Sequence, residues 1–167
     1  MGLEHLNALP ANEASQEFLK CCGSKRWADA MMRRRPYTGL EDLTLTANKI
    51  WWSLERSDWL EAFRSHPQIG EKKAAEAVSE QAQKWSSQEQ SAVQTASQET
   101  LDALGELNQR YEEKFGFIFI VCATGKSADE MLALLRARLQ NDVATELPIA
   151  AAEQAKITEI RLKKLVY

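Results

Sequence analysis

The stretch Phe117-Ile118-Phe119-Ile120-Val121-Cys122 decides the fold class of this chain. It is apolar, rich in β-branched and aromatic residues, and too short to make a helix of its own, so we expect it to be extended and buried. A single strand cannot make a sheet, and the rest of the sequence offers no second strand candidate. We therefore predict an all-α protein, a single-domain helical bundle over 1–167 with one buried extended segment near 117–123.

The composition is that of a soluble globular protein. Of the 167 residues, 44% are hydrophobic and 27% are charged, which suits one domain with a sizeable core. The charges comprise 21 Lys and Arg against 24 Asp and Glu, and no basic stripe follows any face, so we expect no nucleic-acid partner. No apolar run approaches a membrane span, and the first residues lack a signal peptide.

The three cysteines indicate a reducing compartment. Their number is odd, and Cys21 and Cys22 are adjacent, so we expect no disulfide framework. Together with the absence of signal-peptide features, this pattern favours a cytoplasmic location.

Glycine, proline and capping residues set the ends of the predicted helices. Ser127 with Glu130 is typical of a helix start, and Gly116 of a helix end. The aromatic residues Trp51, Trp52 and Trp59 stand at helical spacing, so we expect them in the core. The predicted helices span about 10–22, 24–35, a stretch from Gly39 through Leu54, a short one from Ser57 to His66, 71–83, 87–114, 127–141, and a last one opened by Thr145 or Glu146 with Pro148 in its first turn.

The last predicted helix carries a charge on its apolar face. At ~100° per residue, Arg161 falls within the arc of apolar residues, and a guanidinium there needs an anionic partner. Two interpretations stay open. The first is structural: Arg161 either forms an ion pair or extends its aliphatic side chain so that the guanidinium reaches the rim of the helix. The second is functional: the guanidinium binds a carboxylate or oxyanion of a ligand. The apolar arc consists of Leu147, Ala150, Ala151, Ala155, Ile157, Leu162 and Leu165.

His66 stands where a helix should stop. Pro67 disfavours helical backbone at His66, and Gly70 permits a turn soon after. The histidine is either an ordinary helix-terminal residue, favoured by the helix dipole when charged, or a ring presented to a cleft. No acidic cluster around it has metal-ligand spacing, and His5 is too close to the terminus to serve as a ligand, so we expect no metal.

The stretch Ser86-Ser87-Gln88-Glu89 has the pattern of a capping box. Ser86 would cap the helix, and Glu89 would reach back to the Ser86 amide. In the first turn Glu89 would also stay ionised, so it could accept hydrogen bonds from N–H groups of a ligand. Cys122 is a weak candidate for a nucleophile, because a buried cysteine in an apolar run is usually inert packing.

Four stretches, taken together in this order and spacing, resemble the family of 2-oxo-4-hydroxy-4-carboxy-5-ureidoimidazoline (OHCU) decarboxylase. The likeness runs from near residue 7 to 165 and implies an all-helical fold that catalyses, without a cofactor, the last step from urate to (S)-allantoin. Ile118 is a departure, since many members have proline there. The four stretches are His66-Pro67-Gln68-Ile69-Gly70-Glu71, Trp85-Ser86-Ser87-Gln88-Glu89-Gln90, the run from Lys114 to Lys126, and Arg161-Leu162.

The resemblance implies that His66, Glu89 and Arg161 are the catalytic residues. We hypothesise that His66 moves the proton, Glu89 orients N–H groups of the substrate, and Arg161 pairs with a ring oxygen or the departing carboxylate. Main-chain groups of 119–123, left unpaired by the missing sheet partner, would hold the polar edges of the ring. The substrate-contacting residues implied are Pro67, Ser86, Ser87, Gln88, Glu89, Gln90, Phe119, Ile120, Val121, Cys122, Ala123 and Arg161.

Two alternatives remain at this point. One is a non-enzymatic helical interaction module, in which the three residues would be unrelated cap and ion-pair residues lying far apart. The other is a hydrolase of a neighbouring purine-degradation intermediate. The decarboxylase interpretation requires the three side chains to converge on one pocket that takes the small molecule OHCU, and it leaves assembly as a homodimer open.

Overall fold

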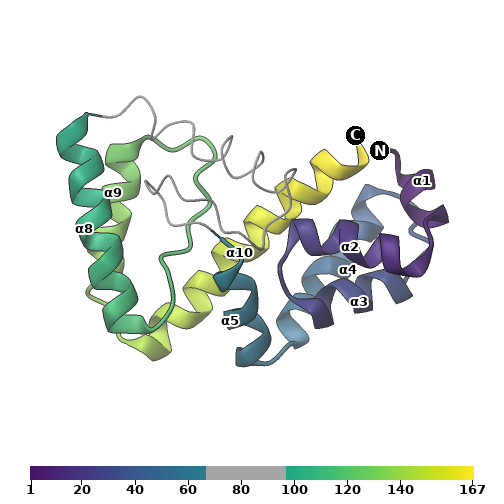
Figure 1. Ribbon diagram of the computed structural model, residues 1–167, viewed down its shortest axis with the longest axis horizontal. Helices are drawn as coiled ribbons and strands as arrows, with labels where there is room; N and C mark the ends of the chain where they lie inside the picture. The colour runs from purple at the N-terminus through teal and green to yellow at the C-terminus, as the bar shows by residue number, and fades with distance from the viewer. Residues whose placement is uncertain (67–96) are drawn as a thin grey trace. The chain divides into compact units, whose positions relative to one another are not determined.

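The computed structural model describes residues 1–66 and 97–167, which form helices joined by loops (Figure 1). No strand occurs among these residues, so the all-α prediction is confirmed. The helices are α1 (Leu3–Ala8), α2 (Ala11–Cys21), α3 (Lys25–Arg33), α4 (Leu40–Ser53), α5 (Arg56–Arg64), α8 (Gln98–Phe115), α9 (Ala128–Arg138) and α10 (Val143–Val166).

The chain divides into two compact units. The first comprises Met1–Ala62 and Ala155–Tyr167, and the second comprises Phe63–Gln154. The assignment of 1–167 to one domain stays a prediction. No helix in the described ranges is both long and apolar enough to cross a membrane.

The core of the first unit forms around Trp27 of α3. Its ring meets Phe18 of α2 edge-on, with ring centroids 6.1 Å apart, and its indole N–H donates to the carbonyl of Ala47 on α4 at 3.1 Å. Such a buried indole contributes apolar area and a satisfied hydrogen bond at once. The side chains of α2, α3 and α4 therefore share one core.

The prediction that all three tryptophans lie in the core is wrong for Trp52. Trp51 is buried as predicted, but Trp52 is 46% exposed. Adjacent residues on a helix point about 100° apart, so Trp52 turns away from the face that buries Trp51. Its ring instead contacts that of the half-buried Trp59, with centroids 5.6 Å apart.

Helix α1 was not predicted from the sequence. It has six residues and no side-chain cap at its start, and so short a helix is not stable alone. Contacts distant in sequence hold it, because the Arg35 guanidinium donates to the carbonyls of Leu6 at 2.9 Å and Leu9 at 2.7 Å. Leu6 itself is fully buried.

In the second unit, α8 begins later than predicted. Ser97 has extended backbone, and its hydroxyl accepts the amide N–H of Thr100 at 3.2 Å, so it is the N-cap of α8. The prediction of one continuous helix from Ser87 to Lys114 is therefore wrong, because Ser97 is not helical. The end at Gly116 is confirmed; the helix predicted over 71–83 and the start at Ser87 lie outside the described residues.

The last two helices differ from their predicted bounds by a few residues. Ser127 caps α9 as predicted, accepting the Glu130 N–H at 3.1 Å, but the helix ends at Arg138 rather than near Asn141. Helix α10 begins at Val143, because the Asp142 carboxylate accepts the Thr145 N–H at 2.7 Å. Hydrogen bonds from the Thr145 hydroxyl and from its backbone amide together hold the pKa of Asp142 below its usual range. Pro148 is thus in the second turn, not the first.

Two glycines of one helix should respond oppositely to alanine. Gly116, which ends α8, has φ +79°, whereas Gly105 lies inside the helix, and an added Cβ would meet no atom within 4 Å at either site. We expect Gly116→Ala to lower the free energy of unfolding by about 1 kcal/mol and Gly105→Ala to raise it by about 0.5–1 kcal/mol. Urea unfolding measures both; effects of the same sign would contradict this explanation.

Candidate active site

His66 lies just beyond the end of α5, as its neighbour in sequence, Pro67, predicts. Its amide donates to the Phe63 carbonyl at 3.2 Å and closes the last turn, and its side chain is half-buried. The ring Nε2 lies 2.5 Å from Oε1 of Gln154 on α10, 88 residues further along the chain. Gln154 is completely buried, so the imidazole is anchored to a fixed point inside the second unit.

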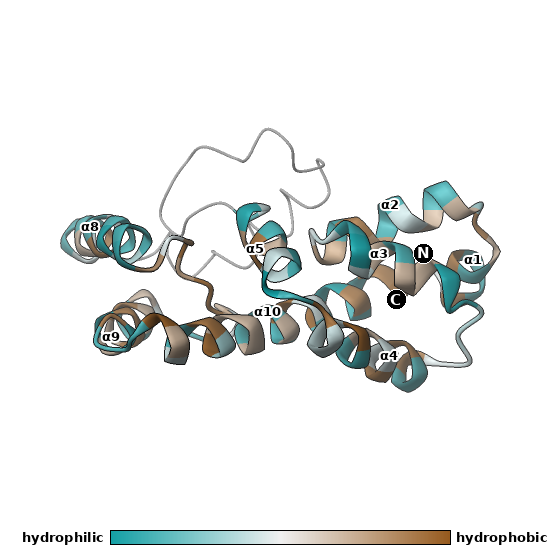
Figure 2. Cartoon of the chain, turned by 90° about the horizontal axis from the view of Figure 1, so that it is seen from below, coloured by the Kyte–Doolittle hydropathy of each residue, from teal (hydrophilic) through white to brown (hydrophobic). Residues whose placement is uncertain are grey.

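The segment 117–123 is buried except for the half-buried Ile118, and it contains neither helix nor strand, as predicted. It follows α8 and is hydrophobic along its length (Figure 2). The Phe117 ring packs against Phe63 of α5, with centroids 5.4 Å apart, and against Tyr111 of α8 at 5.8 Å. Phe63 precedes His66 by three residues, so the same packing that buries the segment also fixes the helix end carrying the histidine.

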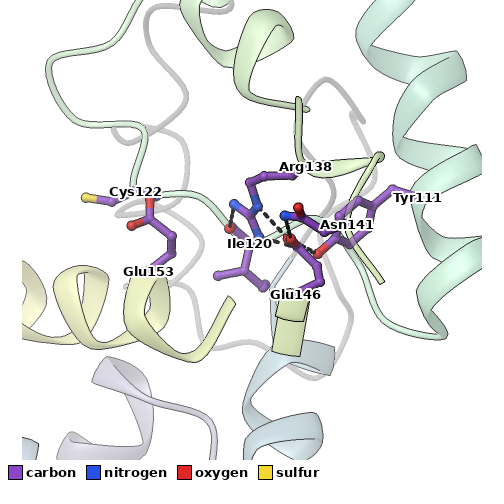
Figure 3. Close-up of polar contacts among 7 residues, drawn as sticks. All are labelled: Tyr111, Ile120, Cys122, Arg138, Asn141, Glu146 and Glu153. Atoms are coloured by element: carbon purple, nitrogen blue, oxygen red, sulfur yellow. Dashed lines mark hydrogen bonds and ion pairs between the residues drawn. The ribbon is translucent and has the colours of Figure 1, made fainter. Parts of the chain in front are cut away.

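Charged side chains take the place of a neighbouring strand for this segment (Figure 3). The Ile120 carbonyl accepts from Nη1 of Arg138 at 2.6 Å. The Cys122 amide donates to Glu153 Oε1 at 3.1 Å, and its carbonyl accepts from Lys126 Nζ at 2.8 Å. The expectation that the main chain here stays unpaired is therefore wrong for these three groups, because buried backbone groups find side-chain partners when no strand is available.

Consecutive residues of α10 join the histidine to the extended segment. Glu153 accepts the Cys122 amide, and Gln154 contacts the His66 ring. One turn of α10 therefore holds two parts of the predicted site, His66 and the stretch Phe119–Ala123, within the second unit.

A buried polar cluster that sequence analysis missed lies next to Ile120 of the segment (Figure 3). The Glu146 carboxylate, with no exposed surface, accepts from Arg138 Nε at 2.5 Å, from the Tyr111 hydroxyl at 2.6 Å and from Asn141 Nδ2 at 3.0 Å. The Arg138 guanidinium also lies 4.5 Å from the centroid of the Phe119 ring. The cluster ties α8, α9 and α10 to the segment through Arg138.

A signal for this cluster was present in the sequence. The buried positions of α9 include Met131, Leu135 and Arg138, so Arg138 continues the apolar stripe of its helix, as Arg161 does on α10. Burial and the neighbouring Glu146 carboxylate raise the pKa of Tyr111 well above its usual range. The phenol therefore stays protonated and donates to Glu146.

Arg161 lies in the first unit and is 4% exposed, which confirms its place within the apolar arc of α10. Its charge acts on the thiols of Cys21 and Cys22, two buried cysteines. Burial dominates, however: it raises the pKa of Cys22 to about 12 and that of Cys21 further. Both thiols are therefore neutral.

Six of the thirteen implied site residues lie outside the described residues. His66 belongs to the second unit and Arg161 to the first, and each is placed only within its own unit. In the described part of the chain, no three His, Cys, Asp or Glu side chains gather where they could hold a metal ion. The predicted residues outside the described ranges are Pro67, Ser86, Ser87, Gln88, Glu89 and Gln90.

Solved structures of other proteins share this helical fold. The chain is similar to a crystal structure of OHCU decarboxylase in the presence of (S)-allantoin, with 42% identity and a TM-score of 0.78, covering 90% of this chain and 96% of that one. A crystal structure of (S)-allantoin synthase shares the fold at 18% identity and a TM-score of 0.72, covering 99% of this chain and 54% of that one. The OHCU decarboxylase family model matches residues 7–163, and the chain belongs to this family.

Relatives of known activity include both longer and similar-sized proteins. The chain is 44% identical to the uric acid degradation bifunctional protein TTL of Arabidopsis thaliana, covering 89% of this chain and 46% of that protein. It is 26% identical to OHCU decarboxylase of Haloferax volcanii, covering 96% and 93%. The chain thus spans about half of the Arabidopsis protein, 32% of a bifunctional Bacillus relative, and nearly all of the Haloferax enzyme.

Proposed function

We propose that this chain decarboxylates OHCU to (S)-allantoin without a cofactor. Membership of the family and the names of its relatives supply the substrate and reaction. The observation that carries the proposal for this chain is the contact that fixes the His66 ring, whose Nε2 lies 2.5 Å from Oε1 of Gln154. The neighbouring residue on α10, Glu153, holds the buried segment by accepting the Cys122 amide.

In the proposed reaction, His66 moves the proton. The bond between the ring carbon and the carboxylate breaks, CO2 leaves, and the electron pair moves into the ring of the substrate. His66 accepts the proton of the substrate hydroxyl and then returns a proton to a ring carbon on one face. An imidazole suits both steps because its ordinary pKa, about 6.5, lies near neutrality.

Arg161 and Glu89 are proposed to hold the substrate. The placement of Arg161 in the substrate site rests on the family resemblance. Its planar guanidinium suits the departing carboxylate or a ring oxygen, and Glu89 would orient the N–H groups. The roles of Pro67, Ser86, Ser87, Gln88 and Gln90 rest on the family resemblance alone.

The segment Phe119–Ala123 is proposed to line the substrate site. Its main chain is tied to Arg138 and Glu153, so it does not need to reorganise when a ligand binds. Such preorganised polar groups stabilise developing charge more effectively than groups that must first reorient.

The fate of freshly generated OHCU tests the function. We expect the protein to accelerate loss of OHCU and to give the circular dichroism signal of (S)-allantoin. A hydrolase would consume OHCU but give another product. An interaction module would leave the spontaneous decay unchanged. Either of the last two results would contradict the proposal.

Arg161→Lys should separate binding chemistry from structure. Lys keeps the charge but lacks the planar guanidinium that can form two parallel hydrogen bonds, so we expect kcat/KM to fall on the order of 10²-fold. The free energy of unfolding should change by less than about 1 kcal/mol. Arg110→Lys, at an exposed position of α8, is the control and should change neither. If Arg161→Lys loses several kcal/mol of stability and keeps its activity, Arg161 is a structural ion-pair residue.

The compartment and the assembly belong to the same proposal. A cytoplasmic location accords with three buried free thiols and with the reducing compartment that the cysteine pattern indicates. A homodimer would show twice the chain mass of 18.9 kDa in solution. Both stay predictions.

A further inference from the structure

We propose that Gln154 is a positioning residue that sets the tautomer of His66, an inference that rests on the proposed function. Gln154 Oε1 lies 2.5 Å from His66 Nε2. An amide oxygen can only accept a hydrogen bond, so Nε2 must carry a proton in this pair. In the neutral imidazole the single proton then resides on Nε2, and the basic lone pair is on Nδ1. Gln154 thereby selects Nδ1 as the atom of His66 that exchanges protons.

The neutrality of Gln154 matters to the reaction. A carboxylate at this distance would favour the charged imidazolium and raise the pKa of His66, and an imidazolium cannot accept the proton of the substrate hydroxyl. A neutral amide fixes the ring without this effect. Once His66 has taken a proton, the same hydrogen bond becomes charge-assisted and therefore stronger. Gln154 thus supports the protonated ring between the two proton transfers.

The residues around Gln154 hold its side chain in one position. Its side chain has no exposed surface, and Ala150 and Ala151, one turn earlier on α10, are also completely buried. The preceding residue, Glu153, accepts the Cys122 amide at 3.1 Å. This turn of α10 therefore holds the ring and the extended segment in one geometry, which is what a base that must meet a bound substrate requires.

Nitrogen NMR of the full chain tests the tautomer directly, without any substrate. The chain has two histidines, His5 and His66, and His66→Asn assigns their ring signals. Above the pH at which the ring loses its charge, we expect the His66 signals of a protonated Nε2 and a bare Nδ1. A ring protonated at Nδ1 would overturn the inference, because it would mean that the amide nitrogen of Gln154 faces Nε2.

Two variants link the tautomer to turnover. In Gln154→Leu, the His66 ring should show both tautomers, and kcat should fall on the order of 10- to 100-fold, the range seen when a residue that orients a functional side chain is lost, with KM little changed. Gln154→Glu, which preserves the size of the side chain, should keep the ring charged at a pH where the wild-type ring is neutral. Gln109→Leu, at an exposed position of α8, should match the wild type.

The outcomes separate this inference from the proposed function. A wild-type ring protonated at Nε2 in a protein that leaves OHCU untouched would support the positioning role and reject the decarboxylase. If the wild-type protein turns over OHCU, and Gln154→Leu changes neither the His66 tautomer nor kcat, the positioning role alone is rejected. If Gln154→Leu does not fold, the wild-type spectrum and Gln154→Glu decide the question.

Discussion

Replacing His66 by Asn should lower the rate of OHCU consumption by about 10²- to 10⁴-fold, the usual contribution of a general acid or base. Asn is polar but does not titrate near neutrality, so neither proton transfer has a carrier. The helical signal in circular dichroism should stay unchanged, because α5 ends at Arg64 and the substitution removes no helix hydrogen bond. The measurement is the initial rate of loss of freshly generated OHCU, corrected for its spontaneous decay.

His5→Asn is the matched control. His5 is the other histidine of the chain and lies on α1, in the first unit, and nothing in the proposed reaction depends on it. We expect wild-type rates from this variant. Wild-type turnover in His66→Asn would remove His66 from the mechanism.

Replacing Glu146 by Gln should lower the free energy of unfolding by about 3–5 kcal/mol, the cost of breaking a buried ion pair by removing one partner. The substitution preserves the volume but leaves the Arg138 charge uncompensated in the interior. It also weakens the acceptor of the Tyr111 hydroxyl. Because Arg138 holds the Ile120 carbonyl, the extended segment should loosen as well. Urea unfolding, with the midpoint and slope fitted together, measures the loss.

An exposed ion pair in the same unit provides the control. Glu106 and Arg110 on α8 lie 3.0 Å apart, and both side chains are about 65% exposed. Such pairs contribute at most about 0.5 kcal/mol, so Glu106→Gln should unfold at nearly the wild-type urea concentration. Equal losses in the two variants would show that the buried cluster does not stabilise this unit.

Local signals predicted most of the fold, and they failed where a second signal competed or a distant contact decided. Ser127 and Gly116 set helix ends as expected, since a cap acts on its own turn. Ser97 was overlooked because Ser86 offered a fuller capping pattern upstream, and Asp142 capped α10 earlier than Thr145 could. Helix α1 was missed because Arg35, 29 residues from Leu6, holds it.

The candidate site was predictable only in part for the same reason. His66 and Arg161 carry local signals, the proline that follows one and the apolar arc around the other. The partners of the site do not, because Gln154 is 88 residues from His66 and Glu153 is 31 residues from Cys122. The sequence could have indicated Arg138 through its place in the apolar stripe of α9, but not the carbonyl that it holds.

A crystal structure of this chain with (S)-allantoin bound would show whether the three residues share one site. We expect one ligand in contact with the His66 ring, the Glu89 carboxylate and the Arg161 guanidinium, beside the main chain of Phe119–Ala123. The ligand bound elsewhere, or these three side chains far apart around an apolar interior, would contradict this prediction.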